Sequence, residues 1–166
     1  MRPNPDNRLR ISTPTDTTIV LTRTFRAPRR LVWEAMFTPE KMRRWMLPPP
    51  DWAMTVCECD ARVAGALRLV WKNAEADPFM SLHGVFTDVV VPERIVHTEI
   101  MLTGSGQPAG SQVETHEFAE ADGVTTMRIT QVHLSKEARD GAVACGMDEG
   151  MQAGFVRLEE MLVGRE

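Results

Sequence analysis

The sequence of 166 residues has only three cysteines and no long apolar run. An odd number of cysteines does not make a disulfide framework, and Cys57 and Cys59 have no second pair that would complete a zinc site. No apolar stretch approaches the roughly 20 residues of a membrane-spanning helix, and no apolar segment follows the basic residues of MRPNPDNRLR as in a signal peptide. We therefore expect a cytoplasmic protein that makes no membrane contact.

Positive charge is not in excess either. The chain has 19 lysines and arginines against 23 aspartates and glutamates, which gives a net charge of −4. Binding to a phosphate backbone needs a basic stripe, so nucleic acid is not expected as a partner. A glycine-rich phosphate loop, a nucleophile elbow and an HExxH motif are also missing from the sequence. We expect no cofactor and no metal ion.

The hydrophobic content of 43% suffices for the core of one domain. Residues 1–15 carry Pro3, Pro5 and Pro14 among polar residues, which predicts a flexible N-terminal arm. The remaining residues, 16–166, are expected to form a single domain.

Alternating apolar residues predict a first strand over 17–25. Two short helices follow in RAPRRLVWEAMFTPEKMRRWM, because Pro28 suits a first helical turn and the three prolines at 48–50 stop the second helix. Turn residues then separate six further strands, which we place at 53–59, 64–72, 82–91, 94–102, 112–119 and 125–134. Short links between successive strands predict an antiparallel meander.

The segment from Ser135 to residue 163 has an apolar face at helical spacing and predicts one long amphipathic helix. Its unusual feature is a glycine every four residues, at 146, 150 and 154, and each costs about 1 kcal/mol relative to alanine. Either Gly154 allows close packing of this helix against its neighbours, or the missing side chains leave a hollow. In the second case Met147 and Met151 would line that hollow.

Four ordered stretches resemble the family of activators of the ninety-kilodalton heat-shock protein ATPase: RTFRAPRRLVWEAMFTPEKMRRWM, VCECDARVAG, HGVFTDVVVPERIVHTE and ARDGAVACGMDEGMQAGFVRLEEML. The resemblance covers about residues 17–163. It implies an α+β helix-grip (START-like) fold, in which a curved antiparallel sheet of about seven strands surrounds the long C-terminal helix. An apolar cavity between sheet and helix is also implied, whereas a particular reaction is not.

The stretch ETHEF, at 114–118, decides what faces that cavity. Side chains alternate along a strand, so Glu114, His116 and Phe118 share one face. A four-residue turn at 120–123 would place His116 opposite Met127 and Glu114 opposite Ile129, on the apolar side of the next strand. This favours an inward direction, although a slip of one residue would turn the same face to solvent.

Counting across the turn at 103–110 then pairs His97 with His116 and Glu99 with Glu114. An inward cluster of this kind must have its carboxylates paired, protonated or hydrated, and histidine–glutamate pairs would satisfy them. Such a cluster can orient the polar group of a ligand, act in general acid–base chemistry, or bind a metal.

These arguments yield one set of candidate site residues. The catalytic candidates are His97, His116, Glu99 and Glu114. The candidate ligand-binding residues are Trp45, Phe86, His97, Glu99, Glu114, His116, Phe118, Met127, Ile129, Gln131, Met147, Met151, Gly154 and Phe155.

The expected function is binding of a small apolar or amphipathic molecule in the cavity. Two alternatives are an enzyme of the cyclase or hydrolase type that uses the histidines and glutamates, and a chaperone-interacting module, which the family's name suggests. Self-association through an exposed strand edge stays open, because nothing in the sequence fixes a dimer.

Overall fold

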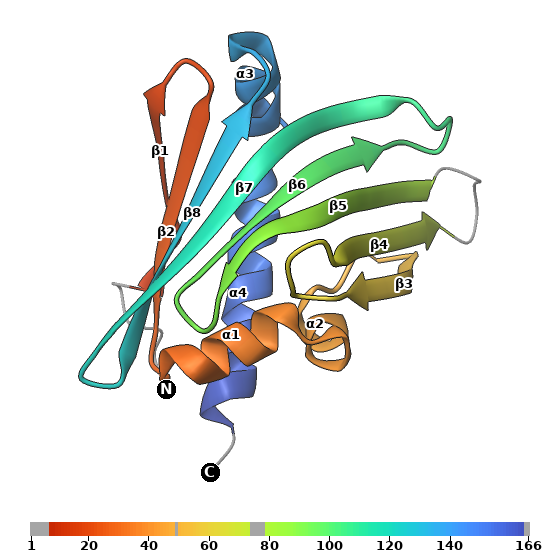
Figure 1. Ribbon diagram of the computed structural model, residues 1–166. Coiled ribbons are helices and arrows are strands. Elements are labelled where there is room, and N and C mark those ends of the chain that lie inside the picture. The colour runs from red at the N-terminus through yellow and green to blue at the C-terminus, as the bar shows by residue number, and fades with distance from the viewer. Residues whose placement is uncertain (1–6, 49, 74–78, 165–166) are drawn as a thin grey trace.

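A computed structural model describes residues 7–48, 50–73 and 79–164 (Figure 1). Within these ranges the chain forms a sheet of eight strands and four helices. None of the helices described has the length and apolar content to cross a membrane. In chain order the elements are β1 (Arg10–Thr15), β2 (Thr18–Phe25), α1 (Arg29–Phe37), α2 (Pro39–Trp45), β3 (Trp52–Cys59), β4 (Ala66–Asn73), β5 (Phe79–Val90), β6 (Arg94–Leu102), β7 (Pro108–Ala121), β8 (Val124–His133), α3 (Lys136–Ala144) and α4 (Met147–Val163).

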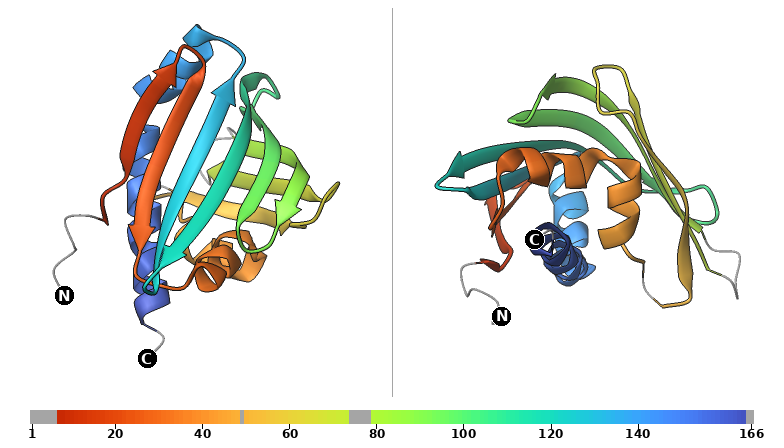
Figure 2. Two further views of the ribbon diagram at one scale, coloured as in Figure 1. Left: turned by 60° about the vertical axis from the view of Figure 1, so that its left-hand side comes forward. Right: turned by 90° about the horizontal axis from the view of Figure 1, so that it is seen from below.

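The strands form one antiparallel sheet in the order β1-β2-β8-β7-β6-β5-β4-β3. The sheet is curved, and α4 lies on its concave side, as the view from below shows (Figure 2). Helices α1 and α2 lie across one end of the sheet (Figure 1). The predicted helix-grip fold is confirmed, with eight strands in place of about seven.

The additional strand is β1, in the segment that we predicted as a flexible arm. Residues 10–15 are instead an edge strand, in which Arg10 lies opposite Thr22. The register shifts between Ser12 and Thr15, around Pro14, which has no amide proton to donate. Proline is tolerated at such an edge, so its presence did not exclude a strand. Pro3 and Pro5 lie outside the described residues.

The C-terminal segment is two helices rather than one. Gly146 has a φ of 76°, in the left-handed region that glycine adopts without strain, and it separates α3 from α4. The start of α3 agrees with the sequence, since the Ser135 hydroxyl accepts a hydrogen bond from the Ala138 amide at 3.1 Å.

Gly154 serves close packing. A Cβ atom on this residue would lie 3.4 Å from Cε3 of Trp45, so the indole occupies the space that a side chain would need. Trp45 stacks on Phe155 with ring centroids 5.8 Å apart, and Phe155 meets the edge of Phe25 at 5.9 Å. The indole nitrogen of Trp45 also donates to the Ala35 carbonyl at 2.9 Å. The hollow that the glycine spacing allowed is therefore filled at this position.

Candidate functional site

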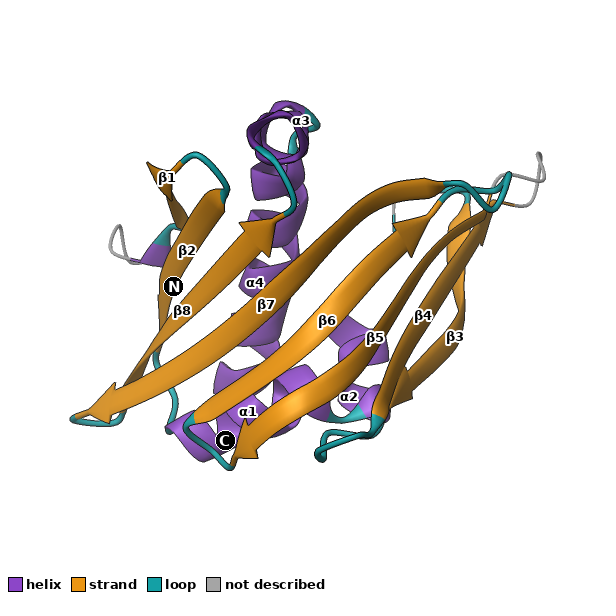
Figure 3. Ribbon diagram, turned by 45° about the horizontal axis from the view of Figure 1, so that its top comes forward, coloured by secondary structure: helices purple, strands orange, loops and turns teal. Residues whose placement is uncertain are grey.

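The ETHEF stretch lies on β7, between β6 and β8 (Figure 3). Glu114, His116 and Phe118 are buried, whereas Glu117 is exposed. The inward direction of this face is thus confirmed. The sheet curves around the helices on this side (Figure 2).

The predicted register was wrong by two residues at both hairpins. Asp122 and Gly123 make a two-residue turn with positive φ angles of 53° and 75°, and Ala121 lies opposite Val124. His116 therefore lies opposite Ile129 instead of Met127, and Glu114 opposite Gln131 instead of Ile129. A shift of two residues keeps every side chain on the same face, so the inward direction survived the error.

On the other side, His97 of β6 lies opposite Glu114, and Glu99 opposite Gln112. The predicted pairs His97–His116 and Glu99–Glu114 are therefore wrong. Apolar side chains on β6 do not mark the inner face, since His97 is 2% exposed and Ile100 is 45% exposed.

Hydrogen bonds converge on Glu114. Its Oε1 accepts from Nε2 of His116 at 2.7 Å, while its Oε2 accepts from Gln131 at 2.9 Å and Gln112 at 3.1 Å. The Gln112 amide also donates to Glu99 at 2.8 Å. One amide group therefore bridges the two buried carboxyl groups.

His97 lies between those carboxyl groups. Its Nε2 is 3.9 Å from Oε1 of Glu114, and its Nδ1 is 3.7 Å from Oε1 of Glu99. The same Nδ1 lies 3.3 Å from the Thr98 carbonyl oxygen. The imidazoles of His97 and His116 are stacked, with centroids 5.5 Å apart and planes inclined by 26°.

The two carboxyl groups differ in acidity because their partners differ. Burial raises the pKa of Glu99 well above its usual value, and the charge of Glu114 adds to the effect. Burial also favours a higher pKa for Glu114, but the hydrogen bond and charge of His116, together with His97 and Gln131, outweigh it and lower that pKa to about 2. Near neutral pH, Glu114 is ionised and Glu99 holds its proton more tightly than an ordinary glutamate does.

Burial lowers the pKa of His97 and of His133, and the charge of Glu114 opposes the shift in both cases. These imidazoles are therefore neutral over a wider pH range than an exposed histidine is. Neutral imidazoles offer a lone pair on one ring nitrogen, which a hydrogen-bond donor or a cation can use.

Three buried polar atoms of this cluster have no hydrogen-bond partner among the described residues: Nδ1 of His116, Oε1 of Gln131 and Nε2 of His133. Aromatic rings surround the same imidazoles. His116 meets the edge of Phe37 at 5.4 Å, and His97 meets Phe86 at 5.4 Å. The cluster thus combines open hydrogen-bonding positions with apolar walls.

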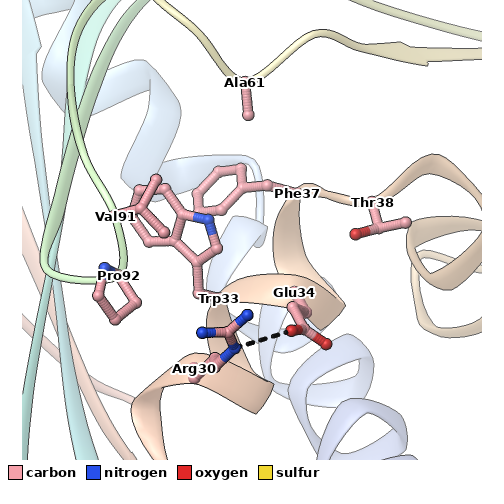
Figure 4. Close-up of a pocket in the computed structure, with 8 residues that line it drawn as sticks. All are labelled: Arg30, Trp33, Glu34, Phe37, Thr38, Ala61, Val91 and Pro92. Carbon is pink, nitrogen blue, oxygen red and sulfur yellow. Dashed lines mark hydrogen bonds and ion pairs between the residues drawn. The ribbon is translucent and has the colours of Figure 1, made fainter.

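A pocket of about 310 Å³ lies beside the cluster, between α1, Ala61 and the turn that joins β5 to β6 (Figure 4). It is lined by Arg30, Trp33, Glu34, Phe37, Thr38, Ala61, Val91 and Pro92. Trp33 and Phe37 point into it from α1, with the Arg30–Glu34 ion pair of 3.4 Å nearby (Figure 4). Phe37 therefore lines the pocket and also contacts His116 of the polar cluster.

The candidate residues from the sequence fall into two groups. The structure brings His97, Glu99, Glu114, His116 and Gln131 together, with Phe86, Phe118, Met127 and Ile129 buried on the same side of the sheet. Trp45, Gly154 and Phe155 belong to the packing between α2 and α4, and Met147 and Met151 lie partly exposed at the edge of the core.

Two residues that shape the site were missed. Gln112 precedes Glu114 by two positions and therefore shares its face, so alternation alone would have found it. Phe37 is the last residue of α1, and no sequence signal placed it against His116.

The fold agrees with the comparisons. The family described as activator of Hsp90 ATPase homolog 1-like protein matches residues 26–163. The chain belongs to this family. No protein of curated function matches it.

Solved structures show the same fold. A protein from Rhodobacter sphaeroides is 25% identical, with a TM-score of 0.84, and the match covers 96% of this chain and 100% of that one. A protein from Mycobacterium smegmatis is 20% identical, with a TM-score of 0.79 and coverage of 92% and 95%. A protein from Nitrosomonas europaea is 24% identical, with a TM-score of 0.75 and coverage of 93% and 100%.

Proposed function

We propose that this member of the family binds a small amphipathic molecule. The polar group of that molecule contacts His116, Gln131 and His133, and its apolar part contacts the aromatic residues at the end of α1. Members of this fold class commonly bind ligands, which makes binding a reasonable starting point for this chain.

The observation that carries the proposal is the set of unpaired buried atoms. A buried polar atom without a partner costs about 1–3 kcal/mol, and such atoms are rare in folded proteins. Here three of them belong to one cluster around Glu114. A bound molecule that donates to His116 Nδ1 and Gln131 Oε1 would offset this cost. These two acceptors favour a ligand with hydroxyl, amine or amide protons.

The neighbouring pocket supplies the apolar part of the site. Its volume of about 310 Å³ is at the lower end of ligand pockets, and Trp33 and Phe37 give it aromatic walls. Phe37 lines this pocket and contacts His116, so a ligand would reach the polar cluster by displacing the Phe37 ring.

Native mass spectrometry of protein purified without denaturation tests the proposal. We expect one adduct per chain, and His116→Phe should remove it by taking away Nδ1 and filling the space. Glu117→Gln, on the exposed face of the same strand, should keep the adduct. The proposal fails if wild-type protein carries no adduct and a library of hydroxyl- and amine-bearing small molecules causes no thermal shift.

An acid–base enzyme is a second candidate, favoured by the contact between Glu114 and His116. A carboxylate that accepts from one imidazole nitrogen fixes the proton there and leaves the other nitrogen, Nδ1, as a base. Turnover of an ester or amide panel, abolished by His116→Gln and retained in Glu117→Gln, would support this candidate. Ligand binding without turnover would leave the first proposal alone.

A chaperone-interacting role stays a prediction that rests on the family's description. It is tested by the ATPase rate of an Hsp90 homologue with and without the protein. A stimulated rate would support it, and an unchanged rate at saturating protein would exclude stimulation.

A further inference from the structure

Two imidazoles and one carboxylate meet at a single buried point. Ring nitrogens of His97 and His116 and a carboxylate oxygen of Glu114 all lie within 4.8 Å of one another. The shared atom is Oε1 of Glu114, which is 2.7 Å from Nε2 of His116 and 3.9 Å from Nε2 of His97. All three side chains are buried, at 2%, 5% and 7% exposure for His97, His116 and Glu114.

The position of the His97 proton makes this point suitable for a cation. Nδ1 of His97 faces the Thr98 carbonyl oxygen at 3.3 Å, and a carbonyl only accepts, so the ring proton lies on Nδ1. The lone pair on Nε2 then faces a carboxylate oxygen across 3.9 Å. Two electron-rich atoms directed at one another repel, whereas a cation between them attracts both.

The surroundings of Glu114 resemble those of a metal ligand. Its Oε2 accepts from Gln131 and Gln112, which fixes the carboxylate and leaves Oε1 directed at the imidazoles. Ligands of bound metals are held by outer hydrogen bonds of this kind, and the Thr98 carbonyl does the same for His97. Among the described residues, the ion-pair partners of Glu114 are His97 and His116, so no lysine or arginine competes for the carboxylate.

We propose that His97, Glu114 and His116 bind one divalent transition-metal ion through the two Nε2 atoms and Oε1. Two imidazoles and a carboxylate suit Zn²⁺, Fe²⁺ or Co²⁺, while Mg²⁺ and Ca²⁺ prefer oxygen ligands. Binding through Nε2 replaces the proton that Nε2 of His116 donates to Glu114, and that proton is released to solvent. The charge of the carboxylate offsets half of the charge of the ion.

Three protein ligands leave a fourth position open, as in zinc sites that bind or activate a ligand. This part of the inference rests on the proposed small-molecule function, since an oxygen or nitrogen atom of the ligand would take the open position. The metal site itself requires no organic ligand.

The test uses protein without a histidine tag, stripped of metal by a chelator and titrated with Zn²⁺ in a calorimeter. We expect one saturable site per chain. Glu114→Gln should weaken binding by at least about 100-fold, the upper end of what losing an outer contact alone costs. Glu117→Gln and His83→Gln should bind as the wild type does, because Glu117 is exposed and His83 pairs with Ser81 at 3.0 Å. Absence of saturable binding, or equal affinity in Glu114→Gln, overturns the proposal.

A second measurement covers the case in which Glu114→Gln does not fold. X-ray absorption of zinc bound to the wild type should show two imidazole nitrogens and a carboxylate oxygen in the first coordination sphere, and sulfur ligands would overturn the assignment. Neither measurement involves an organic ligand. A failed zinc titration therefore leaves the small-molecule proposal intact, and a missing ligand adduct leaves the metal site intact.

Discussion

Two parts of the interior lie against the same concave face of the sheet. They differ in whether apolar packing or hydrogen bonding holds their side chains. Around α4, the rings of Trp45 and Phe155 fill the space that the absent side chain of Gly154 leaves, and the indole nitrogen of Trp45 has a carbonyl partner. Around β7, Glu114 gathers three donors while neighbouring atoms of His116 and Gln131 remain without partners. None of these three α4-side residues has an unpaired buried polar side-chain atom among the described residues, whereas the second part has hydrogen-bonding capacity left over.

Within one small domain, the packing around α4 contributes mainly to stability, and the polar cluster on β7 is the candidate for function. Apolar burial stabilises by roughly 25 cal/mol per Å² and does not depend on direction, so the packing of Trp45, Gly154 and Phe155 depends on a close fit. The β7 region keeps an ionised carboxylate away from water, which is costly unless every oxygen is satisfied. Substitutions in the two regions should therefore differ in their dependence on pH.

The largest effect is expected for Phe155→Ala. It removes a fully buried ring that contacts both Trp45 and Phe25, and such truncations cost about 3–5 kcal/mol. Val156→Ala, one position along α4 and 39% exposed, is the matched control and should cost much less. Denaturant unfolding measures both. Equal losses would show that the two faces of α4 pack alike and would remove the contrast.

Glu114→Gln should show a loss of stability that depends on pH. The pKa of Glu114 is lowered from 4.5 to about 2, so its charge contributes stability that is present above pH 4.5 and lost as the pH falls toward 2. The difference between wild type and variant should be on the order of 3 kcal/mol near neutral pH and shrink with acidification. Unfolding curves at several pH values, in chelator, measure it. A difference independent of pH would mean that packing rather than charge is lost.

Gly154→Leu should destabilise by about 1–3 kcal/mol, because the new side chain collides with the Trp45 indole. Gly150→Leu is its control, since a Cβ there meets nothing within 4 Å and leucine favours the helix by up to about 1 kcal/mol. Thermal unfolding of both variants measures the contrast. If Gly154→Leu were as stable as the wild type, the helix would have room that the packing does not show.

The smallest effect is expected for Glu99→Gln. The raised pKa of Glu99 means that the folded state binds its proton more tightly, so the wild type loses stability as the pH rises from 4.5 through the raised pKa. Glutamine carries no such proton, so the variant should gain stability relative to the wild type as the pH rises above 4.5, by less than the other three variants lose. At pH 4 the advantage should vanish. Exposed Glu117→Gln should change little at either pH, and an equal gain there would point to a general charge effect.

The order and type of most elements follow from the sequence, because hydrophobic alternation and turn residues are strong along this chain. The strand predicted at 94–102 has those bounds in the structure, and the two short helices lie where Pro28 and the prolines at 48–50 place them. Two elements differ. The strand β1 was not predicted, because it contains Pro14 and all of its side chains are exposed. The helix was predicted as continuous, because the apolar periodicity extends across Gly146, where the structure divides it.

The candidate site was predictable in its face but not in its contacts. The apolar residues of the partner strand predicted that Glu114 and His116 are buried. A register error of two residues does not change which face of the strand is buried. The predicted partners of these residues were wrong, because the length of each turn decides which residues lie opposite one another. The pocket at Phe37 depends on how α1 approaches the turn after β5, which no local pattern encodes.

The two edges of the sheet have a consequence for how copies of the protein behave when crowded. On β1 the regular pairing covers Arg10, Ile11 and Ser12 before the register shifts, and on β3 it shifts between Met54 and Val56. A strand from another molecule extends a sheet only along an uninterrupted row of amides and carbonyls. Each described edge of this sheet offers such a row for a few residues at a time, which disfavours fibre growth by strand addition.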